Sequence, residues 1–244
     1  MRNRIITFLV CLLVLGLCSV FARTYIVAVG INDYSKVQGA DNLRLPVNDA
    51  TDFAALFKRN NSATYTLLTD SRATRNNIVA AMKNVYSKAG KDDTIIFYFS
   101  GHGYHGGYLA YDGKLPYETV RKAMSRKGVK CKLVFADACH AGGMRADARR
   151  AAKAVDQAKK SDVVMFMASR NNEASIERST MKNGLFTDCL LLGLRGKADT
   201  NRDRIITAKE LFVFVHDGVI KMSRDKQHPV MWGNFNDSMP VMKW

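Results

Sequence analysis

The stretch KLVFADACHAGG, residues 132–143, sets out the architecture of this chain. Its apolar run Leu133–Phe135 predicts a strand that is buried on both faces, and the small residues 141–143 predict a turn at the strand's C-terminal end. Open parallel sheets carry their chemistry at that end of their strands. Cys139 therefore stands where a reactive side chain would be expected.

A second stretch of the same form, TIIFYFSGHG at residues 94–103, delivers His102. A thiol is a poor nucleophile until it ionises, and a neighbouring imidazole makes it competent near neutral pH. The chain between the two stretches is long enough for one crossover to an adjacent strand. We therefore predict Cys139 as nucleophile and His102 as base, with the backbone amides of Gly103 and Cys139 binding the oxyanion.

Strand and helix patterns alternate along the rest of the chain. Apolar runs at 25–31, 65–68 and 163–168 predict further buried strands, and residues 106–111 predict a small hairpin. Amphipathic or apolar helical patterns occupy 47–57, 74–89, 117–126, 185–194 and 211–222. This order predicts an α/β fold, a three-layer α/β/α sandwich around a mainly parallel sheet. No linker or repeat divides residues 23–244, so we predict one domain there.

The first 22 residues read as a cleaved export signal. Arg2 and Arg4 precede an apolar run from Ile5 to Val20, and small residues stand at the expected cleavage site. An uncleaved anchor is the alternative, but the run is short for a membrane span. A lipoprotein attached through Cys18 is the weaker alternative. We expect an exported protein, periplasmic or secreted, with no stable membrane anchor.

Charge and cysteine content bear on nucleic-acid binding and on which cysteine is reactive. The 37 basic and 22 acidic side chains give a formal net charge of +15, yet the charge is dispersed apart from residues 145–160, and no nucleic-acid motif accompanies it. We therefore expect no nucleic-acid partner. Beyond the signal, Cys131 and Cys189 read as buried small hydrophobic residues, whereas Cys139 lies at a turn.

The two stretches together resemble those of the caspase and metacaspase-like cysteine peptidases. YIVAVGINDY with Asn48-Asp49-Ala50 is similar to the opening strand and first helix of that family. MFMASRNNEAS and GLFTDCLLLGL are similar to its later segments, so the resemblance spans about residues 25–235. It implies a bacterial exported member with the caspase-like fold, using His102 as base and Cys139 as nucleophile without a required third residue.

Asp137 separates this chain from the animal caspases, whose signature has Gln at that position before the cysteine. A carboxylate there favours a cationic side chain at P1, the substrate residue before the cleaved bond, and repels an acidic one. The resemblance to metacaspases implies that Asp137, Asp49 and Ser100 bind this side chain. Asp49 could otherwise be a carboxylate of the helix surface. We expect protein or peptide substrates cleaved after Arg or Lys.

The basic segment 144–160 is itself a possible substrate for an enzyme of that specificity. An enzyme that cuts after basic residues could cut itself there and convert a zymogen into two associated fragments, as relatives do. A solvated charged helix explains the same residues. Both interpretations stay open.

Residues 199–210 have the oxygen-ligand spacing of an EF-hand calcium loop, but Arg204 stands where Gly normally permits the sharp turn. Thr207 and Glu210 also read as a capping box that starts the next helix. We expect no required cofactor and keep calcium as the alternative. We predict no other metal ligands, because His105, His216 and His228 lack ligand spacing.

Two other functions remain to be weighed. A catalytically silent caspase-like interaction module would usually have lost the histidine or the cysteine, and both are present here. A peptidase of the same fold with an asparaginyl or acidic P1 preference is the third hypothesis. The physiological substrate and the oligomeric state are not predicted from the sequence.

Overall fold

The computed structural model describes residues 22–58, 62–139, 162–169 and 181–243, together with residues 153, 156 and 157. The predicted signal segment, the turn after Cys139 and nearly all of the basic segment 144–160 lie outside these ranges.

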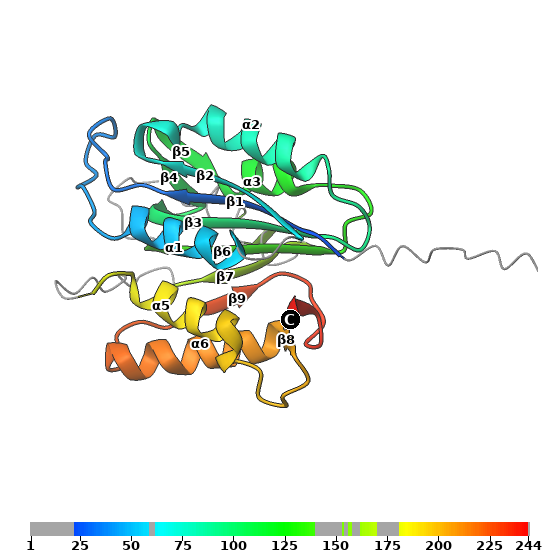
Figure 1. Cartoon of the computed structure of the whole chain (residues 1–244). Coiled ribbons are helices and arrows are strands. Elements are labelled where there is room, and N and C mark those ends of the chain that lie inside the picture. The colour runs from blue at the N-terminus through cyan, green and yellow to red at the C-terminus, as the bar shows by residue number, and fades with distance from the viewer. Residues whose placement is uncertain are drawn as a thin grey trace, which may run out of the picture.

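A mostly parallel sheet forms the centre of the molecule, with helices on both faces (Figure 1). Its main path runs β2-β1-β3-β6-β7-β9, and the hairpin of β4 and β5 extends β3. The strands are β1 (Thr24–Gly30), β2 (Ala63–Thr69), β3 (Thr94–Tyr104), β4 (Gly107–Ala110), β5 (Gly113–Pro116), β6 (Cys131–Cys139), β7 (Val164–Met167), β8 (Ile205–Thr207), β9 (Val230–Trp232) and β10 (Pro240–Lys243).

Two helical layers complete the sandwich (Figure 1). The helices α2 and α3 cover one face of the sheet, and α1, α5 and α6 cover the other. The helices are α1 (Pro46–Lys58), α2 (Arg75–Tyr86), α3 (Tyr117–Met124), α5 (Leu185–Leu192) and α6 (Ala208–Ser223), with the short turns η1 (Asp70–Arg72) and η2 (Gly193–Lys197). The predicted α/β/α sandwich is confirmed.

The central strands read as continuous apolar runs because both of their faces are buried. Side chains alternate along each strand, so Phe97 and Phe99 of β3 pack under α2 and α3, whereas Tyr98 joins the core under α1 and α5. In β6, Leu133 and Phe135 belong to that second core. The same alternation turns Asp137 toward α1 and α5, where it meets their polar side chains.

The C-terminal part differs from the sequence prediction in detail. Residues 230–232, for which the sequence analysis predicted no strand, extend the sheet as β9, antiparallel to β7. The strands β8 and β10 pair in a separate antiparallel ribbon that the sequence analysis did not predict. Both are too short, at three and four residues, to leave a periodic pattern. No helix in the described ranges is long and apolar enough to cross a bilayer.

Candidate active site

The C-terminal ends of β3 and β6 meet at the middle of the sheet. These strands are parallel, and their register pairs His102 with Cys139 and Ser100 with Asp137. Neighbouring strands lie about 4.8 Å apart, so the backbones that carry the thiol and the imidazole are one strand spacing from each other. The side chain of Cys139 is outside the described residues.

The imidazole of His102 is half-buried and held by a backbone carbonyl. Its Nε2 lies 2.7 Å from the carbonyl oxygen of Asp41. Because a carbonyl only accepts hydrogen bonds, Nε2 carries the proton and donates it. Nδ1 is then the nitrogen with the lone pair, which is the form that a general base requires.

Tyr34 fixes the strand end that carries this histidine. Its ring centroid lies 4.6 Å from that of His102, and its hydroxyl accepts the His102 backbone N–H at 2.8 Å. The same hydroxyl donates to the carbonyl of Leu109 at 3.3 Å, which links β3 to β4. Gly101, with a φ of 151°, leaves room for this contact, since a Cβ there would lie 2.3 Å from the Tyr34 hydroxyl oxygen.

Gly103 follows His102 in β3, at the point where that strand begins to pair with β4. The predicted oxyanion donor therefore lies one residue from the predicted base, in a regular strand. The second predicted donor, the backbone amide of Cys139, lies on the neighbouring strand, where Cys139 pairs with His102.

A buried acidic pair, Asp49 and Asp137, lies beside these strand ends. Asp49 of α1 is 1% exposed, and its Oδ2 accepts the Ser100 hydroxyl at 2.8 Å. Its Oδ1 accepts the backbone N–H of Gly184 at 2.8 Å. A Cβ on Gly184 would lie 2.3 Å from Asp137 Oδ2 and 3.2 Å from Asp49 Oδ2, so this glycine sits between the two carboxyl groups.

The two acids influence each other's ionisation. Burial is the main cause that raises the pKa of Asp49, to about 8, and the neighbouring charge of Asp137 adds to it. Hydrogen bonds from Ser100 and Gly184 oppose this shift without cancelling it. The structure thus brings together Asp49, Ser100 and Asp137, the three residues that the sequence analysis grouped as a specificity site. The helix-surface interpretation of Asp49 is wrong, because its side chain is buried.

Sequence reasoning did not single out Thr187 of α5. Its backbone N–H and its hydroxyl both donate to Asp137 Oδ2, at 3.1 and 2.8 Å. A threonine in a mostly apolar helix, GLFTDCLLLGL, was the available signal. Tyr34 and Gly184 carried no comparable signal, since their contacts depend on the tertiary fold.

The other described cysteines are poor nucleophiles. Cys189 is 3% exposed, as predicted, and burial raises the pKa of its thiol to about 11. Cys131 is half-buried rather than buried, and burial again raises the pKa of its thiol. Neither stands at the C-terminal end of a strand.

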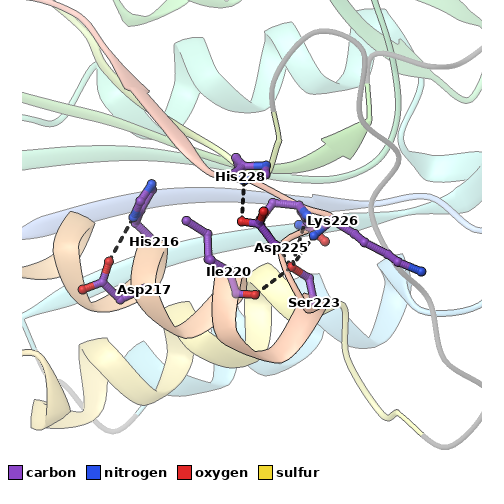
Figure 2. Close-up of polar contacts among 8 residues, drawn as sticks. His216, Asp217, Ile220, Ser223, Asp225, Lys226 and His228 are labelled. Carbon is purple, nitrogen blue, oxygen red and sulfur yellow. Dashed lines mark hydrogen bonds and ion pairs between the residues drawn. The ribbon is translucent and has the colours of Figure 1, made fainter.

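Of the remaining histidines of the C-terminal region, His216 lies within α6 and His228 follows the turn after it (Figure 2). His216 Nδ1 and His228 Nε2 each lie 3.0 Å from one carboxylate, those of Asp217 and Asp225. In the last turn of α6 the Ser223 hydroxyl donates to the carbonyl of Ile220 at 3.1 Å. Within the described ranges no group of three or more His, Cys, Asp or Glu side chains could hold a metal ion.

The loop 199–210 is bonded mainly within itself. Thr207 and Glu210 form the predicted capping box, in which the Thr207 hydroxyl accepts the Glu210 N–H at 3.2 Å. Arg204 takes a φ of 65°, the left-handed conformation that Gly would adopt more easily. Asp199 Oδ1 is buried without a hydrogen-bond partner. The capping box is confirmed, and calcium binding stays a prediction.

Comparison with known proteins places this arrangement in a family. The caspase-domain model of the C14 peptidases matches residues 23–239. A search of curated protein sequences finds no significant match. Among solved structures, a Geobacter sulfurreducens protein has 20% sequence identity and a TM-score of 0.65, covering 91% of this chain and 97% of its own. Caspase-1 of Spodoptera frugiperda has 15% identity and a TM-score of 0.63, covering 87% and 86%.

Proposed function

The chain belongs to the caspase-domain family, whose members are generally cysteine peptidases, and from that premise we propose that it is a cysteine endopeptidase that cleaves after Arg or Lys. The observation that carries this proposal is the register of β3 and β6. It pairs His102 with Cys139 and, two residues earlier, Ser100 with Asp137. A nucleophile, its base and an acidic side chain for the substrate thus share two adjacent strand ends.

The chemistry proceeds by acyl transfer. His102 Nδ1 takes the thiol proton of Cys139, and the thiolate sulfur attacks the scissile carbonyl carbon. The amides of Gly103 and Cys139 bind the resulting oxyanion. His102 then gives its proton to the leaving amine as the C–N bond breaks. Water hydrolyses the thioester with His102 as base again, which releases the acid product and restores the thiol.

The acidic pair supports the choice of a basic P1 side chain. A guanidinium or ammonium group beside Asp137 and Asp49 would pair with the negative charge of this buried acidic pair. An acidic P1 side chain would add a further buried negative charge and be rejected. Substrate selection would then follow from charge rather than from shape.

Export and self-cleavage complete the proposal. The chain would be exported and delivered to the periplasm or secreted, and it would act on proteins or peptides without nucleic acid or a stable membrane anchor. Self-cleavage within 144–160 would activate a zymogen, since that segment is basic and directly follows the nucleophile's turn.

A panel of fluorogenic peptides with Arg, Lys, Asn or Asp at P1, with and without calcium, tests the proposal. We expect turnover of the Arg and Lys peptides, and a loss of about 10³-fold or more in kcat for Cys139→Ala and for His102→Ala. Equal turnover of the Asp peptide would contradict the specificity. Failure of an arginyl chloromethyl ketone to label Cys139 would instead favour the silent interaction module.

A further inference from the structure

Hydrogen bonds connect two buried hydroxyl groups in series to Asp137. Tyr98 of β3 and Thr187 of α5 are both 0% exposed. The Tyr98 hydroxyl oxygen lies 2.6 Å from Thr187 Oγ1, and Thr187 Oγ1 lies 2.8 Å from Asp137 Oδ2. The catalytic chemistry described above uses neither hydroxyl.

The direction of these hydrogen bonds follows from what each group can donate. An ionised carboxylate only accepts, so the Thr187 hydroxyl proton points to Asp137. Thr187 Oγ1 is then left as an acceptor, and Tyr98 must donate to it. The result is a one-way chain from Tyr98 through Thr187 to Asp137, and each donor strengthens the next.

The two acids are held in different ways. Asp137 Oδ2 receives two donors from Thr187, the hydroxyl and the backbone N–H. Asp49 receives one donor on each oxygen, from Ser100 and Gly184. Two buried carboxylates so close together resist double ionisation, and the deeper burial of Asp49 favours the charge on Asp137, whose Oδ2 Thr187 holds with both of its donors.

We propose that Thr187, backed by Tyr98, is a positioning residue that keeps the charge of the acidic pair on Asp137 and orients its carboxylate for a basic P1 side chain. This inference rests on the proposed function and assigns to α5 a part in it. Among the residues that the structure describes, the titratable groups that interact electrostatically with Asp137 include Asp49 from α1, Tyr98 from β3 and Cys189 from α5. Thr187 is the contact among these elements that donates to it twice.

Variants can distinguish a hydrogen-bonding role of the Thr187 hydroxyl from a role in packing alone. Replacing Thr187 with Val keeps the volume and the backbone N–H but removes the hydroxyl that accepts from Tyr98 and donates to Asp137. Thr187→Ser restores the hydroxyl. Tyr98→Phe removes the far donor, together with the Tyr98 contact to Ser100. Tyr86→Phe is the matched control, because Tyr86 is equally buried and its hydroxyl donates to the carbonyl of Ile96, away from the acids.

The experiment measures kcat and KM for a P1-Arg peptide between about pH 6 and 9, together with the rate at which iodoacetamide alkylates Cys139. Alkylation does not use the acidic pair. For Thr187→Val we expect KM to rise about tenfold with kcat and alkylation within twofold of wild type. The pH at which KM reaches its plateau should move up by about one unit. Thr187→Ser should stay near wild type, and Tyr98→Phe should raise KM by about threefold.

The outcomes distinguish failure of the proposed function from failure of the proposed role of Thr187. A wild-type enzyme without a preference for basic P1 residues overturns the proposed function, and with it this inference. A wild-type enzyme with that preference, combined with an unchanged KM and pH profile in Thr187→Val, overturns this inference alone. It is also overturned if Thr187→Ser loses as much as Thr187→Val, or if Tyr86→Phe raises KM as much as Tyr98→Phe.

Discussion

At the scale of single residues, the buried position of Asp49 makes ionisation of its carboxyl group unfavourable. A carboxyl group that is 1% exposed and lies next to a second buried acid is disfavoured in its charged form. Burial and Asp137 therefore raise the pKa of Asp49 from 3.8 to about 8. The unfolded chain would ionise this group in weak acid, whereas the folded chain keeps it protonated. The difference links the stability of the protein to pH.

The sign of that linkage is testable. The pKa of Asp49 is higher in the folded chain than in the unfolded chain. Its contribution to the free energy of unfolding is therefore fully present below pH 3.8 and is lost as the pH rises toward about 8. We expect the free energy of unfolding to fall between those limits by up to about 1.4 kcal/mol per pH unit from this group. Asp49→Asn, which cannot ionise, should flatten the dependence. Urea unfolding of both proteins at several pH values measures it, and parallel curves would show that Asp49 does not titrate in this way.

Only some residues of the candidate site could be identified from the sequence around them. His102, Cys139 and Asp137 follow buried strand runs, so their place at a strand end could be read from the sequence. Asp49 and Ser100 entered only through the resemblance to a family, because a carboxylate in a helix and a serine in a strand have no distinctive local pattern. Thr187 and Tyr34 were missed, since each acts by contacting a residue far away in the chain.

At the scale of elements, the helices were predictable within a few residues because their apolar faces recur at helical spacing. The predicted helix at 211–222 is α6, which begins three residues earlier at Ala208, because Thr207 is its N-cap. The predicted hairpin at 106–111 forms from β4 and β5, and β5 lies beyond the predicted range. Short strands such as β8 and β10 gain their stability from pairing with each other, which local sequence does not encode.

The cap of α6 has a measurable energy. The Thr207 hydroxyl accepts the Glu210 N–H, and the Glu210 carboxylate accepts the Thr207 N–H at 3.1 Å. Thr207→Ala should lower the free energy of unfolding by about 1 kcal/mol. We expect the same loss in EDTA and in calcium, as denaturant unfolding would measure, because the cap does not depend on a metal.

A control and a contrary result belong to this prediction. Thr200→Ala removes one exposed hydroxyl that donates to Glu210 at 2.9 Å, and should change stability by no more than about 0.5 kcal/mol. If calcium instead raises the melting temperature and Asp199→Asn abolishes that rise, the loop binds calcium through the buried oxygen of Asp199.

At the scale of the whole molecule, the sheet joins the two halves of the chain on either side of segment 144–160. The strand β6 precedes that segment and β7 follows it, yet the two are hydrogen-bonded neighbours, with Leu133 paired to Val164 and Ala136 to Met167. The sandwich could be predicted because strands alternate with helices, whereas the antiparallel β9 at its edge follows from packing over a long sequence distance. A cut between β6 and β7 would therefore break the chain without breaking the sheet.

Self-cleavage then predicts two fragments that stay together. Wild-type protein should give two masses that divide within 144–160 and co-elute in size-exclusion chromatography, since β6 and β7 share four residue pairs in one buried sheet. Cys139→Ala should give one intact chain. Replacing the basic residues of 144–160 by Gln should also keep the chain intact while leaving alkylation of Cys139 unchanged. Identical intact masses for wild type and Cys139→Ala, after incubation with and without calcium, would rule out self-cleavage under those conditions and leave 144–160 as a solvated charged segment.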